Sequence, residues 1–142
     1  MGNYSELIKI ANKKDADWSQ LPKDKVNEIL PWEIANNVYY VGREYKKRPY
    51  HFPQSDLANP YSVISHGGRE KCIQLFRKLL WRQICNYRTT KFDTLLVAGC
   101  LYLKLLVEAE QPITLVCHCY PKPCHAEVIR NFILWAIKEG ID

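Results

Sequence analysis

A short apolar segment, a corner rich in cysteine and histidine, and a long apolar segment follow one another near the end of this chain. Thr114–Cys117 is β-branched and apolar, and predicts a buried strand. Cys124–Glu139 predicts a largely buried helix, because apolar side chains recur along most of it. In the nine residues Cys117–His125, five are cysteine or histidine. Thiols and imidazoles bind soft metals and react near neutral pH, so we expect the chemistry of this protein at this corner.

Three further segments define the rest of the predicted fold. Asn37–Gly42 is β-branched and aromatic and ends in glycine, which predicts the first strand. Arg69–Tyr87 predicts an amphipathic helix, and Asp93–Glu110 predicts a second helix, although its apolar surface also allows a buried strand at Leu95–Ala98. The order strand, helix, helix, strand, helix predicts the α/β class, as a small Rossmann-like three-layer domain with a short, mostly parallel sheet.

The chain of 142 residues is long enough for one domain with its own core. We expect residues 1–36 to form an N-terminal helical extension packed on the domain, with a short helix at Lys23–Leu30 between two prolines. Residues 37–142 would form a single α/β ligand-binding domain, with a short strand at Tyr61–Ile64.

The expected location is the cytoplasm. The first residues lack the basic and apolar regions of a secretory signal, and the longest apolar run, Leu95–Val107, is too short to span a bilayer. The six cysteines are not spaced as a disulfide framework, which favours reduced thiols. The net charge of +5 fits an anionic small molecule as well as nucleic acid, so it does not choose between these ligands.

Two segments are expected to meet at one edge of the sheet. In α/β sheets, ligands bind outside the carboxyl ends of the strands. Gly42 and Arg43 follow the first predicted strand, and the cysteine-rich corner follows the last one. The intervening loop Arg43–Asn59 is long and aromatic, and loops of this length are often functional. The sequence therefore predicts one composite site.

Four motifs occur in the order of a known family. They are Tyr40-Val41-Gly42-Arg43, Ala58-Asn59-Pro60-Tyr61, Gly68-Arg69-Glu70, and a closing Cys-x-Cys-x-Pro-x-x-Cys-His that runs from Cys117 to His125. Over about residues 37–139 the chain resembles the domain of unknown function 4326 family, which occurs in phages and bacteria. The resemblance implies a Rossmann-like domain with a polar pocket. Ala58 and Ala126 stand where that family has glycine, and the insertion between Gly42 and Asn59 is longer than expected.

The first interpretation of the corner is an anion site. Pro123 suits the first turn of a helix, and Glu127 lies three residues after Cys124, as in a capping arrangement. The free N–H groups and the dipole at such a helix start favour phosphate and lower the pKa of a nearby thiol. A phosphate-bearing, nucleotide-like small molecule is the ligand that this arrangement favours.

The second interpretation is a zinc site. Cys117, Cys119, Cys124 and His125 would supply three sulfur ligands and one nitrogen ligand. A Cys-x-Cys segment surrounds a zinc ion less well than the usual Cys-x-x-Cys knuckle. Zinc is therefore the alternative cofactor, and no cofactor is expected under the first interpretation. A zinc-stabilised interaction module or nucleic-acid-binding module is the alternative function.

Catalytic and purely structural interpretations also stand. Cys124 and His125 are candidates for a nucleophile and its base, but adjacent residues rarely lie in line for proton transfer, so whether the protein is an enzyme is left open. Cys117 and Cys119 would equally suit a buried strand as small apolar residues. Asn59 before Pro60 would suit a turn.

The favoured prediction is a cytoplasmic protein that binds a nucleotide-like small molecule and sequesters or processes a nucleotide signal. No membrane partner is expected, nucleic acid is possible but not favoured, and the sequence does not indicate the oligomeric state. The predicted ligand-binding residues are Gly42, Arg43, Asn59, Arg69, Cys119, Pro121, Cys124 and His125.

Overall fold

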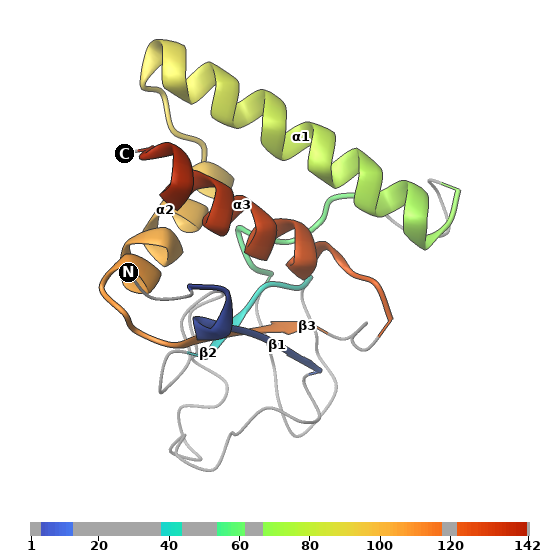
Figure 1. The fold of residues 1–142 in the computed structure, drawn as a ribbon. Coiled ribbons are helices and arrows are strands. Elements are labelled where there is room, and N and C mark those ends of the chain that lie inside the picture. The colour runs from blue at the N-terminus through green and yellow to red at the C-terminus, as the bar shows by residue number, and fades with distance from the viewer. Residues whose placement is uncertain (1–3, 13–37, 44–53, 62–66, 118–121, 142) are drawn as a thin grey trace.

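The computed structural model of the chain describes residues 4–12, 38–43, 54–61, 67–117 and 122–141 (Figure 1). The elements in these ranges are a short 3-10 helix, three strands and three α-helices. They are η1 (Tyr4–Leu7), β1 (Ile8–Asn12), β2 (Val38–Tyr40), α1 (Arg69–Thr90), α2 (Leu95–Glu108), β3 (Ile113–Cys117) and α3 (His125–Glu139).

The three described strands form a parallel sheet in the order β1-β3-β2. Asn12 at the end of β1 is paired with Cys117 at the end of β3, and Tyr40 at the end of β2 is paired with Val116. The Val41 N–H continues the ladder with a bond of 2.9 Å to the Val116 carbonyl. All three carboxyl ends therefore meet at one edge of the sheet, and the predicted α/β class with a parallel sheet is confirmed.

The main core lies between the sheet and the helices. In Figure 1, α2 and α3 lie next to the sheet, and α1 crosses them on the side away from it. Alternate residues of β3 enter this core, as expected from the period of a strand. The fully buried members of the cluster include Val41, Leu57, Phe76, Ile84, Val97, Cys100, Leu103, Val107, Leu115, Ile129, Ile133 and Ala136. On the opposite face of the sheet, Tyr40 and Val116 are also buried.

The helices begin and end close to the predicted residues. α1 continues to Thr90, where Lys91 in the left-handed region donates its N–H to the Tyr87 carbonyl. α2 begins after Thr94, whose side chain caps the Val97 N–H, and the alternative of a strand at Leu95–Ala98 is wrong. The almost continuous apolar surface of that segment belongs to a helix that packs against α1, α3 and β3.

One strand was not expected from the sequence. Residues 8–12, within the predicted helical extension, form β1 and pair with β3 at one edge of the sheet. The segment is short, with Ile8 and Ile10 on either side of Lys9, and the residues at positions 12–15 that follow are polar. The predicted helix at Lys23–Leu30 lies outside the described residues, as does most of the strand predicted at Tyr61–Ile64.

The Rossmann-like arrangement and the third layer stay predictions, because the described helices lie on the same side of the sheet. Within the described ranges, no helix has the length and apolar character needed to cross a bilayer. The five described cysteines, Cys72, Cys85, Cys100, Cys117 and Cys124, form no disulfide with one another.

Candidate functional site

His125 connects the start of α3 to the end of β2. Its Nε2 lies 2.6 Å from the Val41 carbonyl oxygen, and its ring packs edge-on against Phe76 with centroids 5.0 Å apart. A carbonyl only accepts hydrogen bonds, so Nε2 carries the proton and donates it. His125 is 9% exposed. This side chain therefore fixes the first turn of α3 at the carboxyl edge of the sheet.

Cys124 precedes α3 and occupies its N-cap position with extended backbone angles. Its Sγ lies 3.0 Å from the Sγ of Cys117 at the end of β3, and both residues are buried. A serine or aspartate at this position would accept a hydrogen bond from the first turn of the helix. The Cys124 side chain makes no capping bond, so the first turn of α3 has no side-chain cap from this residue.

Arg43 and Asn59 form a second connection at this edge. The Arg43 Nε–H donates to the Asn59 carbonyl at 2.9 Å, across the predicted long loop. The Asn59 amide donates from Nδ2 to the Cys72 carbonyl at 3.1 Å and accepts from the Tyr61 N–H at 2.9 Å. Both ends of the Asn59 amide are thus used to hold the loop against α1. Asn59 would contribute to a pocket mainly by positioning Arg43.

Gly42 is required by the close approach of a tyrosine ring. A Cβ atom at Gly42 would lie 2.6 Å from Oη and 2.7 Å from Cζ of Tyr40. The Tyr40 hydroxyl donates to the Arg43 carbonyl at 2.5 Å, and the Gly42 carbonyl accepts from the Ser55 N–H at 3.0 Å. The packing of Tyr40 therefore explains the glycine at position 42 without any ligand.

Arg69 is the first residue of α1 and follows Gly68, which has a positive φ of 102°. It lies one turn before Cys72, whose carbonyl holds Asn59. Arg69 is partly exposed, and no ion pair of its guanidinium is seen within the described ranges. The structure thus connects Arg43, Asn59 and the first turn of α1 to each other, and connects His125 to the adjacent end of β2.

Metal ligation is poorly supported in the described part of the chain. No group of three or more histidine, cysteine or acidic side chains is placed there to hold a metal ion. Cys117 and Cys124 lie together, but Nε2 of His125 is bound to the Val41 carbonyl. Cys119 and Pro121, which the sequence also placed in the site, lie outside the described residues.

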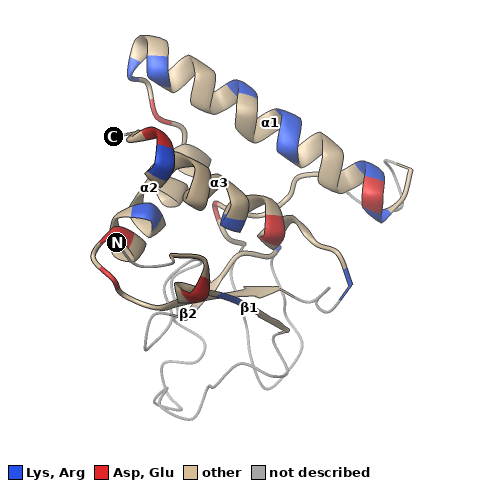
Figure 2. Cartoon of the chain, viewed as in Figure 1, with Lys and Arg blue, Asp and Glu red and all other residues tan. Residues whose placement is uncertain are grey.

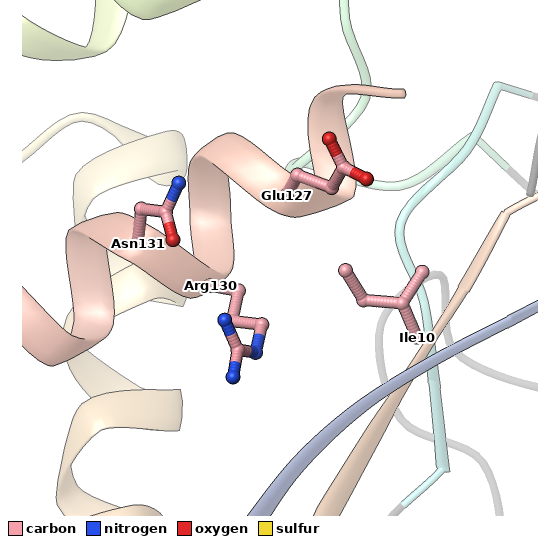
Figure 3. A pocket seen from close by; sticks show the side chains of 4 residues that line it. All are labelled: Ile10, Glu127, Arg130 and Asn131. Carbon is pink, nitrogen blue, oxygen red and sulfur yellow. The ribbon is translucent and has the colours of Figure 1, made fainter. Parts of the chain in front are cut away.

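A cavity between α3 and β1 was missed by the sequence analysis. It has a volume of about 410 Å³ and is lined by Ile10, Glu127, Arg130 and Asn131 (Figure 3). Arg130 donates from Nη2 to the Ser5 carbonyl at 3.0 Å and from Nε to the Ile8 carbonyl at 3.3 Å. Because β1 was not predicted, nothing in the sequence placed Arg130 beside an edge strand.

The model of a family described as Domain of unknown function (DUF4326) matches residues 25–135, which is most of the chain. No curated protein and no solved structure matches. The matched range includes β2, α1, α2, β3 and the corner at Cys124 and His125. This chain belongs to the DUF4326 family.

Proposed function

We propose that the protein binds a phosphate-bearing, nucleotide-like small molecule at the carboxyl edge of its parallel sheet. The observation that carries this proposal is the position of α3, whose first turn starts at this edge without a side-chain cap from Cys124. The backbone N–H groups and the dipole at the start of a helix attract anions. His125 holds this start in place through the Val41 carbonyl.

Two arginines would supply the charge that a phosphate requires. Arg43 lies two residues beyond Val41 and is held at Nε by the Asn59 carbonyl. The terminal nitrogens of a guanidinium suit bidentate contacts to phosphate oxygens. Arg69 begins α1, one turn from the Cys72 carbonyl that anchors Asn59. Fixing Arg43 in this way would reduce the entropy lost when it contacts a ligand.

Binding is better supported than nucleophilic catalysis by Cys124. A nucleophile must reach its substrate, and Cys124 is 2% exposed with its sulfur against Cys117. The Nε2 of His125 donates to a backbone carbonyl rather than to this thiol. We therefore propose that Cys124 and His125 shape the site, and that the protein sequesters a nucleotide signal. We further propose a cytoplasmic location in bacterial or phage-infected cells, because the spacing of the cysteines is not that of a disulfide framework.

Zinc stabilisation is the second candidate, and one observation favours it. The thiols of Cys117 and Cys124 lie 3.0 Å apart at the end of β3 and the start of α3. Two thiolates brought together by the fold are half of a typical structural zinc site. Such a site would need two more ligands, and Cys119 is the residue that the sequence offers for one of them.

Ligand binding can be tested by calorimetry with inorganic phosphate and with nucleoside mono-, di- and triphosphates. Arg43→Ala and Arg69→Ala should each weaken binding by roughly 1.5–3 kcal/mol, the range for hydrogen bonds to charged groups. Lys138→Ala is the matched control, because it removes a positive charge at the opposite end of α3. Arg43→Ala should also lose about 1 kcal/mol of stability with its bond to Asn59.

Two outcomes would contradict the proposal. One is the absence of binding of every phosphate compound to the wild-type protein. The other is an unchanged affinity in both arginine variants, which would mean that the phosphate lies elsewhere. Equal weakening by Lys138→Ala would indicate a general effect of net charge.

A further inference from the structure

The outer surface of α1 concentrates the positive charge of the protein. From Arg69 to Lys91 the chain has seven basic residues and one acidic residue, whereas the whole chain has a net charge of +5. The rest of the chain is therefore nearly neutral. Figure 2 shows lysines and arginines along the whole length of α1, with the single acidic residue, Glu70, in its first turn.

An exposed tryptophan lies in the middle of these charges. Trp81 is 53% exposed and lies beside the buried face of α1, next to Leu80 and at the border with α3. Its ring packs edge-on against Trp135 of α3, with centroids 5.3 Å apart. The guanidinium carbon of Arg88 lies 6.0 Å from the centroid of the same Trp135 ring. Trp81 is therefore held in one orientation while about half of its surface faces solvent.

Two hollows border Trp81. One, of about 450 Å³, is lined by Tyr61, Leu75, Lys78, Trp81 and Arg82. The other, of about 260 Å³, lies between α1 and α3, and its lining includes Arg77, Trp81, Phe132 and Trp135. Each hollow combines an aromatic ring with at least one cation, and no acidic side chain lines either of them in the described part of the chain.

We propose that this outer surface of α1 binds single-stranded nucleic acid. Bases would stack on Trp81, and phosphates would contact Arg77, Lys78 and Arg82, which are exposed on either side of the ring. Cationic side chains that follow a backbone, with aromatic rings between them, are what proteins use to bind single strands. This surface is distinct from the anion site at Arg43, and the proposal does not depend on that site.

An acidic peptide is the competing occupant, and the surface suits it less well. An amphipathic helix needs a continuous apolar groove that takes several side chains along one face. Here the Trp81 ring borders two separate hollows, and cations line both. A strand of stacked bases with a phosphate at every nucleotide matches this alternation of rings and charges.

The test is fluorescence anisotropy with a labelled oligothymidylate of about 16 nucleotides, which covers one single-strand site. The salt concentration is varied between about 50 and 200 mM. Trp81→Ala should weaken binding about 5- to 100-fold, as expected for the loss of base stacking. Trp81→Phe keeps an aromatic ring and should retain most of the affinity. Lys78→Ala with Arg82→Ala should lower the slope of log affinity against log salt by about 1.4.

The matched control is Lys9→Ala with Lys138→Ala, which removes the same charge from exposed positions on other elements. Retained binding in this control, with weakened binding in the α1 variants, would support the proposal. Absence of binding by the wild type at the lowest salt would overturn it. So would equal losses in the control. Polyglutamate that binds with the same dependence on Trp81 would also overturn it, in favour of an acidic protein partner.

Discussion

The corner at α3 and the outer surface of α1 differ in what their side chains contact. At the corner, Cys124 and His125 are buried, and each meets another part of the chain. On α1, Trp81 is half exposed and its cationic neighbours face solvent. The corner has the more reactive residue types, yet α1 has the more accessible ones. Reactive residue types in a sequence therefore do not identify the surface that a partner can reach.

The largest expected effect tests whether His125 is a structural residue. His125→Ala removes the hydrogen bond to Val41 and the contact with Phe76, and leaves a cavity beside a buried carbonyl. It should lower the free energy of unfolding by about 3 kcal/mol. Urea denaturation measures this loss. Arg82→Ala, on the outer surface of α1, should stay within about 0.5 kcal/mol.

A smaller loss in the free energy of unfolding for His125→Ala than for Arg82→Ala would contradict this comparison between the buried corner at α3 and the exposed surface of α1. His125 would then be free to contact a ligand directly.

The next largest effect is the pH dependence of stability that is due to Cys100, a thiol of the core; the comparison is with Cys85, a thiol on the surface of α1. Burial raises the pKa of the Cys100 thiol to about 12, whereas Cys85 on α1 is exposed. As the pH rises from about 9 to about 12, the unfolded chain releases the Cys100 proton and the folded chain keeps it. Stability therefore falls over this window, by about 1.4 kcal/mol at one pH unit above the pKa of the unfolded state.

Cys100→Ala should remove this part of the pH dependence of stability. The difference in unfolding free energy between wild type and variant, measured near pH 8 and near pH 10, should shrink by about 1.4 kcal/mol. Cys85→Ala, which removes an exposed thiol of α1, serves as the control. An unaltered difference for Cys100→Ala would mean that this thiol already ionises in the folded protein.

The smallest expected effect is the change in stability of Cys124→Ser, at the start of α3. Cys124→Ser loses the contact with Cys117 but gains a hydroxyl that is suited to cap the first turn of α3. The net change in stability should be about 1 kcal/mol or less. Thermal unfolding with and without a strong chelator, together with metal analysis of the wild type, measures it.

A structural zinc ion would give the opposite result. The free energy of metal binding would then be part of the folding free energy, so Cys124→Ser and the chelator would each unfold the domain. Stoichiometric zinc in the wild type together with that loss would replace the anion site by a zinc site.

Local patterns in the sequence were sufficient for most of the fold. The helical period of α1 predicts one apolar face with Cys72, Leu75, Phe76, Leu79 and Ile84. Cys72, Phe76 and Ile84 are buried, whereas Leu75 and Leu79 are half-buried. The strand predicted at Thr114–Cys117 is β3, which begins one residue earlier, at Ile113. β1 was missed because five residues with only two isoleucines give a weak signal, and its pairing with β3 is visible only in three dimensions.

The sequence predicted the sheet edge at which the candidate site residues meet, but not their contacts. The rule that ligands bind at the carboxyl ends of strands brought Arg43 and Cys124 to one edge. The bonds that define their roles join residues far apart in the chain. His125 and Val41 are separated by 84 positions, and Asn59 and Cys72 by 13. The exposure of Trp81 depends likewise on how α3 lies against α1.

The strand order β1-β3-β2 has a consequence for biosynthesis. β1 and β2 do not pair with each other, because β3 lies between them and is the last strand to be synthesised. The described sheet therefore cannot assemble until Ile113–Cys117 has been translated and has left the ribosome. Long-range parallel pairing of this kind slows folding and exposes apolar segments while they wait. A nascent chain that stops before Ile113 would lack the strand that joins β1 to β2 in the described sheet.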